Sequence, residues 1–70
     1  MDIVFTEHAL ERLEKRKFIK EEIVEAINFP DKTLKKHGKY YYQKSLERGE
    51  AEIVCERTEK NIKVITLYWL

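Results

Sequence analysis

The stretch that decides the fold is residues 40–57, which reads YYYQKSLERGEAEIVCER. Apolar and polar residues alternate along it, and tyrosine, isoleucine and valine are frequent. A period of two with these residue types is typical of β-strands that bury one face. Arg48 and Gly49 interrupt the alternation, so we predict a hairpin in which a two-residue turn joins strands 40–46 and 51–57.

Further strands are predicted on both sides of this hairpin. Residues 62–70 continue the alternation after a turn at 59–61, and they form the third strand. Residues 33–36 add an edge strand, whose lysines would discourage pairing with another molecule. Residues 3–5 are apolar, and they form either a short first strand or a hydrophobic lead-in to the first helix.

The register of the strands decides which side chains face the core. A two-residue first turn places one set on the face that the helices cover: Tyr40, Tyr42, Leu46, Ala51, Ile53 and Cys55. The opposite set faces outward: Tyr41, Gln43, Ser45, Glu52 and Glu56. A three-residue second loop would add Ile65, Leu67 and Trp69 to the core and leave Thr66 and Tyr68 outside. A two-residue loop would reverse the last strand. We prefer the longer loop because it buries Trp69.

The segment before Pro30 has the spacing of two helices. Thr6 can cap the first helix, which runs to about Arg16, and the second helix spans about 20–28, where Pro30 prevents its continuation. The helices are too short of apolar surface to pack only on each other. We therefore predict a single α+β domain over 1–70, with two N-terminal helices packed on a three- to four-stranded antiparallel sheet.

Composition excludes several classes of protein. Charged residues make up 39% of the 70 residues, the net charge is +1, and Cys55 is the only cysteine. No apolar run approaches the roughly 20 residues of a membrane span, and the N-terminus lacks the pattern of a signal peptide. We therefore expect a cytoplasmic protein without disulfides. The abundance of Lys and Glu, with few Asn, Gln and Met, is typical of thermophiles.

Metal and nucleotide chemistry are not expected either. His8, His37 and Cys55 lack the spacing of a pair of metal ligands. Gly38 and Gly49 are isolated, so the chain has no glycine-rich phosphate loop. We therefore predict that the protein uses no cofactor and no metal.

Two groups of residues are candidates for catalysis. His8, Arg12 and Arg16 follow one another at intervals of four, so they share one side of the first helix, where an imidazole beside guanidinium groups suits acid–base chemistry on a phosphate. Arg57, Thr66 and Tyr68 on the last two strands would hold and polarise a phosphodiester. Both groups also have ordinary structural interpretations, as solvated charges and as residues that favour strands.

A third group suits the binding of RNA. Single-stranded nucleic acid binds where bases stack on aromatic rings and cations meet phosphates, and residues 40–42 are three consecutive tyrosines. Alternation leaves one side of this run exposed. The basic residues of the predicted RNA-binding set are Arg16, Lys35, Lys36, Lys39 and Lys44.

Four short motifs resemble a family of small uncharacterised domains of bacteria and archaea. They are FTEHALERL at 5–13, RKFIKEEI at 16–23, NFP at 28–30 and VITLY at 64–68. The resemblance therefore covers almost the whole chain. In the family pattern the second helix is usually introduced by glycine and serine, where this chain has Lys17 and Ile19.

That family in turn resembles RelE and barnase-like toxins, which cleave RNA on a sheet backed by helices. The resemblance implies a RelE-like fold and a metal-independent endoribonuclease of a toxin–antitoxin pair, with RNA as substrate and an antitoxin protein as partner. It implies catalytic roles for residues at the motif positions, namely His8, Arg12, Thr66 and Tyr68. Arg57 is added on its position alone.

Three functions are compatible with these observations: an RNA-cleaving toxin, a non-catalytic module that binds nucleic acid, and a protein-interaction domain. The first meets a geometric difficulty. The preferred register turns Thr66 and Tyr68 away from the helices, whereas His8 lies on a helix. A site that contains them all needs either the shorter second loop or a His8 that reaches around the edge of the sheet.

Overall fold

Residues 2–70 contain one sheet of five strands, in the order β1-β5-β4-β3-β2. A computed structural model describes residues 2–70 of the chain. Its elements are β1 (Asp2–Phe5), α1 (Glu7–Lys15), α2 (Lys20–Asn28), β2 (Lys32–Lys36), β3 (Lys39–Leu46), β4 (Gly49–Arg57) and β5 (Asn61–Trp69). The predicted α+β class is confirmed. The sheet is mixed and larger than predicted, because β1 joins it by pairing parallel to β5.

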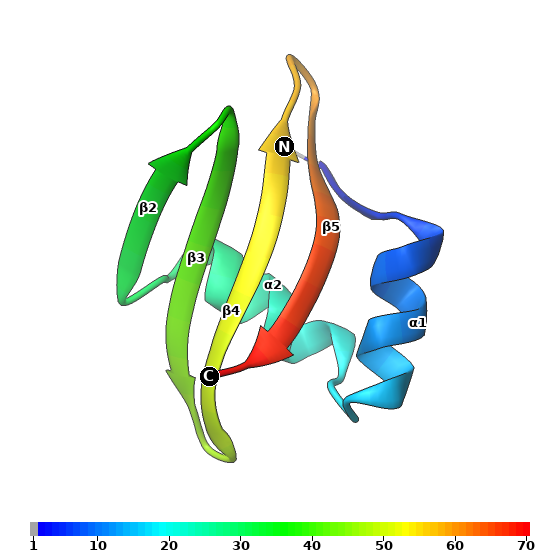
Figure 1. Cartoon of the computed structure of the whole chain (residues 1–70), viewed down its shortest axis with the longest axis vertical. Coiled ribbons are helices and arrows are strands. Elements are labelled where there is room, and N and C mark those ends of the chain that lie inside the picture. The colour runs from blue at the N-terminus through cyan, green and yellow to red at the C-terminus, as the bar shows by residue number, and fades with distance from the viewer. Residues whose placement is uncertain (1) are drawn as a thin grey trace.

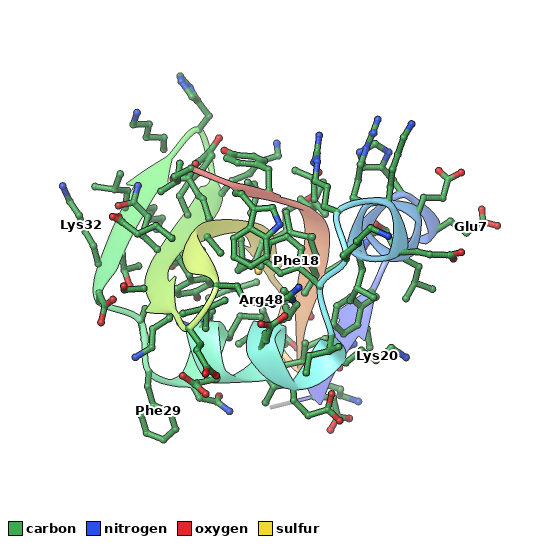
Figure 2. The ribbon with its side chains drawn as sticks, turned by 90° about the horizontal axis from the view of Figure 1, so that it is seen from below. Glu7, Phe18, Lys20, Phe29, Lys32 and Arg48 are labelled. Atoms are coloured by element: carbon green, nitrogen blue, oxygen red, sulfur yellow. The ribbon has the colours of Figure 1, made fainter. Side chains whose placement is uncertain are left out.

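The two helices occupy different places relative to the sheet. Helix α2 crosses behind one face, whereas α1 lies beside β5 at the edge of the sheet (Figure 1). Figure 2, seen from below, shows the same arrangement, with α2 under the sheet and α1 level with it. Of the two helices in the described part of the chain, α2 covers a face of the sheet and α1 does not. We call the face turned away from α2 the open face.

The two sides of the strands follow the predicted alternation. Leu46 pairs with Gly49, so the first turn has two residues as predicted but lies at 47–48, one position earlier. Three residues, 58–60, lie between β4 and β5, as preferred. The register next to this loop is nevertheless that of the shorter loop, because Arg57 pairs with Ile62 and the Thr58 amide donates to the carbonyl of Asn61. The hairpin between β2 and β3 turns at His37 and Gly38, whose φ angles of 51° and 75° are those of a type I′ turn.

The core lies between the sheet and α2, and it contains most of the predicted residues. Its buried members are Ala9, Phe18, Ile23, Ala26, Ile27, Tyr42, Ala51, Ile53, Cys55, Ile62, Val64 and Leu67, with Tyr40, Leu46 and Trp69 partly buried against them. The prediction for Ile65 was wrong. A β-bulge opposite Val54 and Cys55 inserts one extra residue in β5, so Val64 takes the core position.

The N-terminal half is fixed by a small number of polar contacts. Thr6 caps α1 by accepting a hydrogen bond from the Ala9 amide at 3.0 Å. Lys17 adopts the left-handed conformation, with φ of 59°, at the position where glycine would be expected. Ile19 has no capping side chain, but its amide donates to Glu22 Oε1 at 3.0 Å. The two departures from the family pattern are therefore accommodated locally.

A cluster of aromatic and charged groups ties the helices to the end of the sheet. Phe18 stacks on Trp69 with ring centroids 4.0 Å apart. Arg48 donates to the carbonyl of Lys17 and to Glu22 Oε1, both at 2.6 Å; Phe18 and Arg48 lie near the centre of Figure 2. Burial of Glu22 would raise its pKa, but the hydrogen bonds from Arg48 and from the Ile19 amide outweigh this effect, so the pKa of Glu22 is lowered. These contacts hold the loop between α1 and α2 against the β3–β4 hairpin.

Candidate functional site on the open face

The centre of the open face is a row of three polar side chains on neighbouring strands. Gln43 on β3 pairs in register with Glu52 on β4, and Glu52 pairs in register with Tyr68 on β5. Gln43 Nε2 donates to Glu52 Oε1 at 2.9 Å, and the Tyr68 hydroxyl donates to Glu52 Oε2. The three side chains form a continuous hydrogen-bonded row across the sheet.

Glu52 is the unusual member of this row. Its exposed fraction is 9%, although neither helix of residues 2–70 covers the open face. A carboxylate loses hydration when it is buried, which costs free energy unless hydrogen bonds replace the lost water. Here the replacement comes from Gln43 and Tyr68, which also shield the carboxylate from solvent.

Tyr68 is held in its protonated form by these surroundings. Burial raises the pKa of Tyr68 to about 12, and both the hydrogen bond to Glu52 and the charge of Glu52 act in the same direction. The positive charge of Arg16 acts the other way. At neutral pH the phenol is therefore a hydrogen-bond donor to Glu52, and its oxygen can still accept a bond from a ligand.

Helix α1 brings a line of cationic and titratable groups to the edge beside Tyr68. Arg16 Nη1 donates to the carbonyl of Leu67 at 2.6 Å, and Thr6 Oγ1 donates to the carbonyl of Ile65 at 3.3 Å. Helix α1 thus runs along the second half of β5. Arg12 and His8 lie one and two turns before Arg16 on the same side of the helix, and Arg12 Nε donates to His8 Nε2 at 3.4 Å.

The structure brings most of the predicted catalytic residues to one edge. Thr66 and Tyr68 face the open side as the preferred register requires, since they pair with Val54 and Glu52. The geometric difficulty is resolved by the place of α1, which flanks β5 instead of covering the opposite face. His8 and Arg12 belong to the helix that borders this edge.

Arg57 does not join this group. It lies on the side of the sheet that α2 covers, because it alternates with Cys55 and pairs with Ile62. Its guanidinium stands 5.4 Å from the ring centroid of Tyr40. Burial raises the pKa of Tyr42, and the nearby positive charge of Arg57 acts in the opposite direction. Arg57 is therefore separated from Tyr68 by the thickness of the sheet.

The predicted RNA-binding lysines are distributed around the β2–β3 hairpin. Lys36 pairs with Lys39 beside the turn, and Lys35 Nζ stands 5.4 Å from the ring centroid of Tyr40. Lys44 lies farther along β3 and forms an ion pair with Asp31 at 3.6 Å. Arg16 is on the other side of the molecule, at the α1 edge. The predicted set is therefore not a single surface.

Other candidate chemistry finds little support among residues 2–70. Burial raises the pKa of the Cys55 thiol to about 12, so this cysteine is a poor nucleophile at neutral pH. In the described part of the chain, no three side chains of His, Cys, Asp or Glu gather closely enough to hold a metal ion. None of its helices is long and apolar enough to cross a membrane.

Helix α2 has an apolar strip on its outer side. Val24 and Phe29 are exposed, with 70% of Phe29 accessible, and Figure 2 shows Phe29 pointing away from the molecule. They line a shallow depression of about 470 Å³ together with Lys20, Glu21, Glu25 and Asn28. This strip is remote from Glu52 and Tyr68, because α2 lies behind the opposite face.

Comparison with known proteins places the chain in a family. The model described as "Domain of unknown function (DUF4258)" matches residues 5–69. The chain belongs to the DUF4258 family. This confirms the resemblance to an uncharacterised domain family that the four sequence motifs indicated. No curated protein and no solved structure matches the chain.

Within this DUF4258 chain, sequence analysis missed Glu52 and Gln43 as site residues. Both were predicted to face outward, and they do, but an outward position gave no reason to expect that Glu52 is buried. The missing signal was the register, which aligns both residues with Tyr68. A polar row across three central strands is a stronger indication of a site than any of its members alone.

Proposed function

We propose that the protein is a toxin-like, metal-independent endoribonuclease of a toxin–antitoxin pair, and that RNA binds across the open face beside α1. The observation that supports this most is the Glu52–Tyr68 hydrogen bond on an uncovered sheet face, next to a helix that supplies Arg16. An anchored phenol, a carboxylate and a guanidinium at one edge are the groups that phosphodiester cleavage needs.

Each residue is assigned a role by its chemistry. Arg12 and Arg16 neutralise the phosphate, because guanidinium groups bind phosphate oxygens with charge-assisted hydrogen bonds. His8 gives a proton to the leaving 5′-oxygen, since the imidazole side chain is the most frequent general acid of enzymes. Tyr68 and Thr66 orient the 2′-hydroxyl that attacks the phosphorus. Cleavage would leave a 2′,3′-cyclic phosphate and a free 5′-hydroxyl.

The proposal differs from the predicted catalytic set at one position. Arg57 lies on the other side of the sheet, beside Tyr40. Arg16 takes the phosphate-binding role in its place, because its charge already acts on Tyr68. The resemblance of the family motifs to RelE and barnase-like toxins supports the same reaction class, as does the match of His8, Arg12, Thr66 and Tyr68 to those motifs.

The test is cleavage of a single-stranded RNA by purified protein in buffer containing EDTA. We expect His8→Ala and Arg12→Ala to reduce the rate by about 10²–10⁴-fold, the usual contribution of a general acid or base. His37→Asn is the matched control, because it removes the other histidine and asparagine accepts its left-handed conformation. Expression of the wild-type chain alone should arrest growth, and His8→Ala should relieve the arrest.

Three outcomes would refute the proposal. The first is the absence of cleavage by the wild-type protein on all RNA sequences tested. The second is equal cleavage by wild type and His8→Ala, which would indicate a contaminating nuclease. The third is equal loss in His8→Ala and His37→Asn, which would show no special role for His8.

A second candidate function is non-catalytic RNA binding by the β2–β3 end of the sheet. The specific observation is Tyr40, whose ring has Lys35 and Arg57 at 5.4 Å from its centroid. Binding of this kind should weaken steeply with salt and survive the His8→Ala substitution. Lys35→Ala together with Lys39→Ala should then reduce RNA affinity, whereas the cleavage mechanism predicts that they leave the reaction at the open face intact.

A further inference from the structure

The negative charge of Glu52 is not needed for the hydrogen bonds that this buried side chain accepts. The two hydrogen bonds that the carboxylate receives come from neutral groups, the Gln43 amide and the Tyr68 hydroxyl. A glutamine at this position could also accept a bond from Tyr68, and it would not need to bury a charge. Burying a charged group costs more free energy than burying a neutral polar group that makes the same hydrogen bonds. A buried carboxylate here therefore indicates a requirement for its charge or its basicity.

We propose that Glu52 is the proton acceptor behind Tyr68, so that the two residues form a relay that activates the 2′-hydroxyl of RNA on the open face. This inference rests on the proposed function and adds a residue to it. Glu52 acts through Tyr68 and is a positioning residue, whereas Tyr68 contacts the substrate. The geometry that supports the relay is the bond from the Tyr68 hydroxyl to Glu52 Oε2, combined with the 9% exposure of Glu52.

The reaction step is balanced in protons and bonds. The 2′-oxygen forms a bond to phosphorus, and its proton passes to the oxygen of Tyr68. At the same time the phenolic proton of Tyr68 passes to Oε2 of Glu52, which becomes a neutral carboxylic acid. The bond from phosphorus to the 5′-oxygen breaks, and the leaving oxygen takes a proton from protonated His8. Water then returns the proton from Glu52 to His8.

The surroundings of the pair suit such a relay. Tyr68 stays protonated up to strongly alkaline pH, since burial and Glu52 both raise its pKa. A phenolate intermediate is thus unfavourable, and the concerted transfer to Glu52 avoids it. The Gln43 hydrogen bond at 2.9 Å holds the other carboxylate oxygen and fixes the orientation of Oε2 towards Tyr68. Arg16 stands near Tyr68 on the α1 side, where the phosphate would bind.

The decisive variant is Glu52→Gln, with Glu56→Gln as the matched control. Glu56 lies on the same strand and the same face, pairs with Lys63 and is exposed, so the control changes the same charge without touching the relay. We expect Glu52→Gln to lower kcat for RNA cleavage by about 10²-fold or more, with KM changed far less. The acidic limb of the pH–rate profile should disappear with it. Glu56→Gln should keep the rate within about twofold.

A second readout does not depend on cleavage. The ionisation of Tyr68 can be followed by the ultraviolet absorbance of tyrosinate, taking the difference between each protein and its Tyr68→Phe partner. In Glu52→Gln the midpoint should fall from about 12 towards the ordinary 10.0, because the negative charge that opposes ionisation is gone while the burial remains. In Glu56→Gln it should stay in place.

The outcomes separate the relay from the proposed function. No cleavage by the wild-type protein overturns both. Cleavage that Glu52→Gln leaves unchanged in rate and pH profile overturns only the relay, and so does an equal loss in Glu52→Gln and Glu56→Gln. Should Glu52→Gln fail to fold, Tyr68→Phe carries the test. It must then lose about as much kcat and the same acidic limb, because members of a relay act as a unit.

Discussion

The two faces of the sheet bury the middle of β4 equally well but by different means. Residues 51–55 are all buried, with Ile53 at 0% on the covered face and Glu52 at 9% on the open face. On the covered face the burying partners are apolar side chains of α2 and its neighbours. On the open face they are polar neighbours in the sheet, Gln43 and Tyr68. A buried residue therefore does not always belong to the hydrophobic core. Apolar neighbours indicate a core, whereas polar neighbours that form hydrogen bonds indicate a candidate site.

The largest expected difference between the faces is in the response to truncation. Ile53→Ala should lower the free energy of unfolding by about 2–5 kcal/mol, because it leaves a cavity beneath α2 that the packed core cannot close. Val54→Ala on the open face should cost about 1 kcal/mol, since water can reach the space. Urea denaturation of both variants measures the comparison. Equal losses would show that the two faces are packed alike.

The next effect concerns the polar row on the open face. Glu52→Ala should cost about 1–3 kcal/mol, because it leaves the Tyr68 hydroxyl and the Gln43 amide without their acceptor. Glu52→Gln keeps an acceptor of the same shape and should cost less. The difference between the two substitutions, again from urea denaturation, separates the hydrogen bonds from the charge. If Glu52→Ala proved neutral, the row would be a surface feature without structural consequence.

The sequence alone predicted which residues lie on the covered face, but it did not predict how the open face and its edge are built. The alternation of residues 40–57 identified the covered set, because a single apolar face fixes the register against slippage by one residue. The alternation did not predict the bulge at Ile65, because Val64 and Ile65 are equally apolar and only the tertiary structure decides which of them faces the core. The alternation did not predict the position of α1 either. Helix α1 lies beside the second half of β5, which is left as a free edge because β1 pairs with the first half of β5 only.

The candidate site could likewise be predicted only in part from the sequence. His8, Arg12 and Arg16 could be grouped from helical spacing, and Thr66 with Tyr68 from alternation, because each group lies within one element. Their meeting at one edge depends on where α1 packs, which local periodicity does not encode. Arg57 was predicted on its position alone, although alternation with Cys55 places its side chain on the covered face.

A smaller effect distinguishes the faces at alkaline pH. Each contains a group whose pKa is raised to about 12: Cys55 by burial on the covered face, from 9.0, and Tyr68 by burial and Glu52 on the open face, from 10.0. The folded state holds these protons more tightly than the unfolded state. Their contribution is complete below the unfolded pKa and is lost as the pH rises towards 12.

The free energy of unfolding should therefore decline from about pH 9 upward, and more steeply from about pH 10. Tyr68→Phe should remove the part that begins near pH 10, and Cys55→Ala the part that begins near pH 9. Denaturation curves measured across this range separate the two contributions. A decline of the same slope in Tyr68→Phe as in wild type would mean that the phenol ionises equally easily in both states.

The smallest effect is expected outside both faces, on the outer strip of α2. Phe29→Ser should change the free energy of unfolding by less than about 0.5 kcal/mol, because 70% of the ring is exposed and its removal opens no cavity. Phe18→Ser is the contrasting variant, since Phe18 is 4% exposed and stacked on Trp69, and it should be strongly destabilising. Urea denaturation of the two variants compares a phenyl ring inside the fold with one outside it. A large loss of stability in Phe29→Ser would show that the ring packs more tightly against α2 than its exposure indicates, and that the outer side of α2 contributes to the stability of the fold.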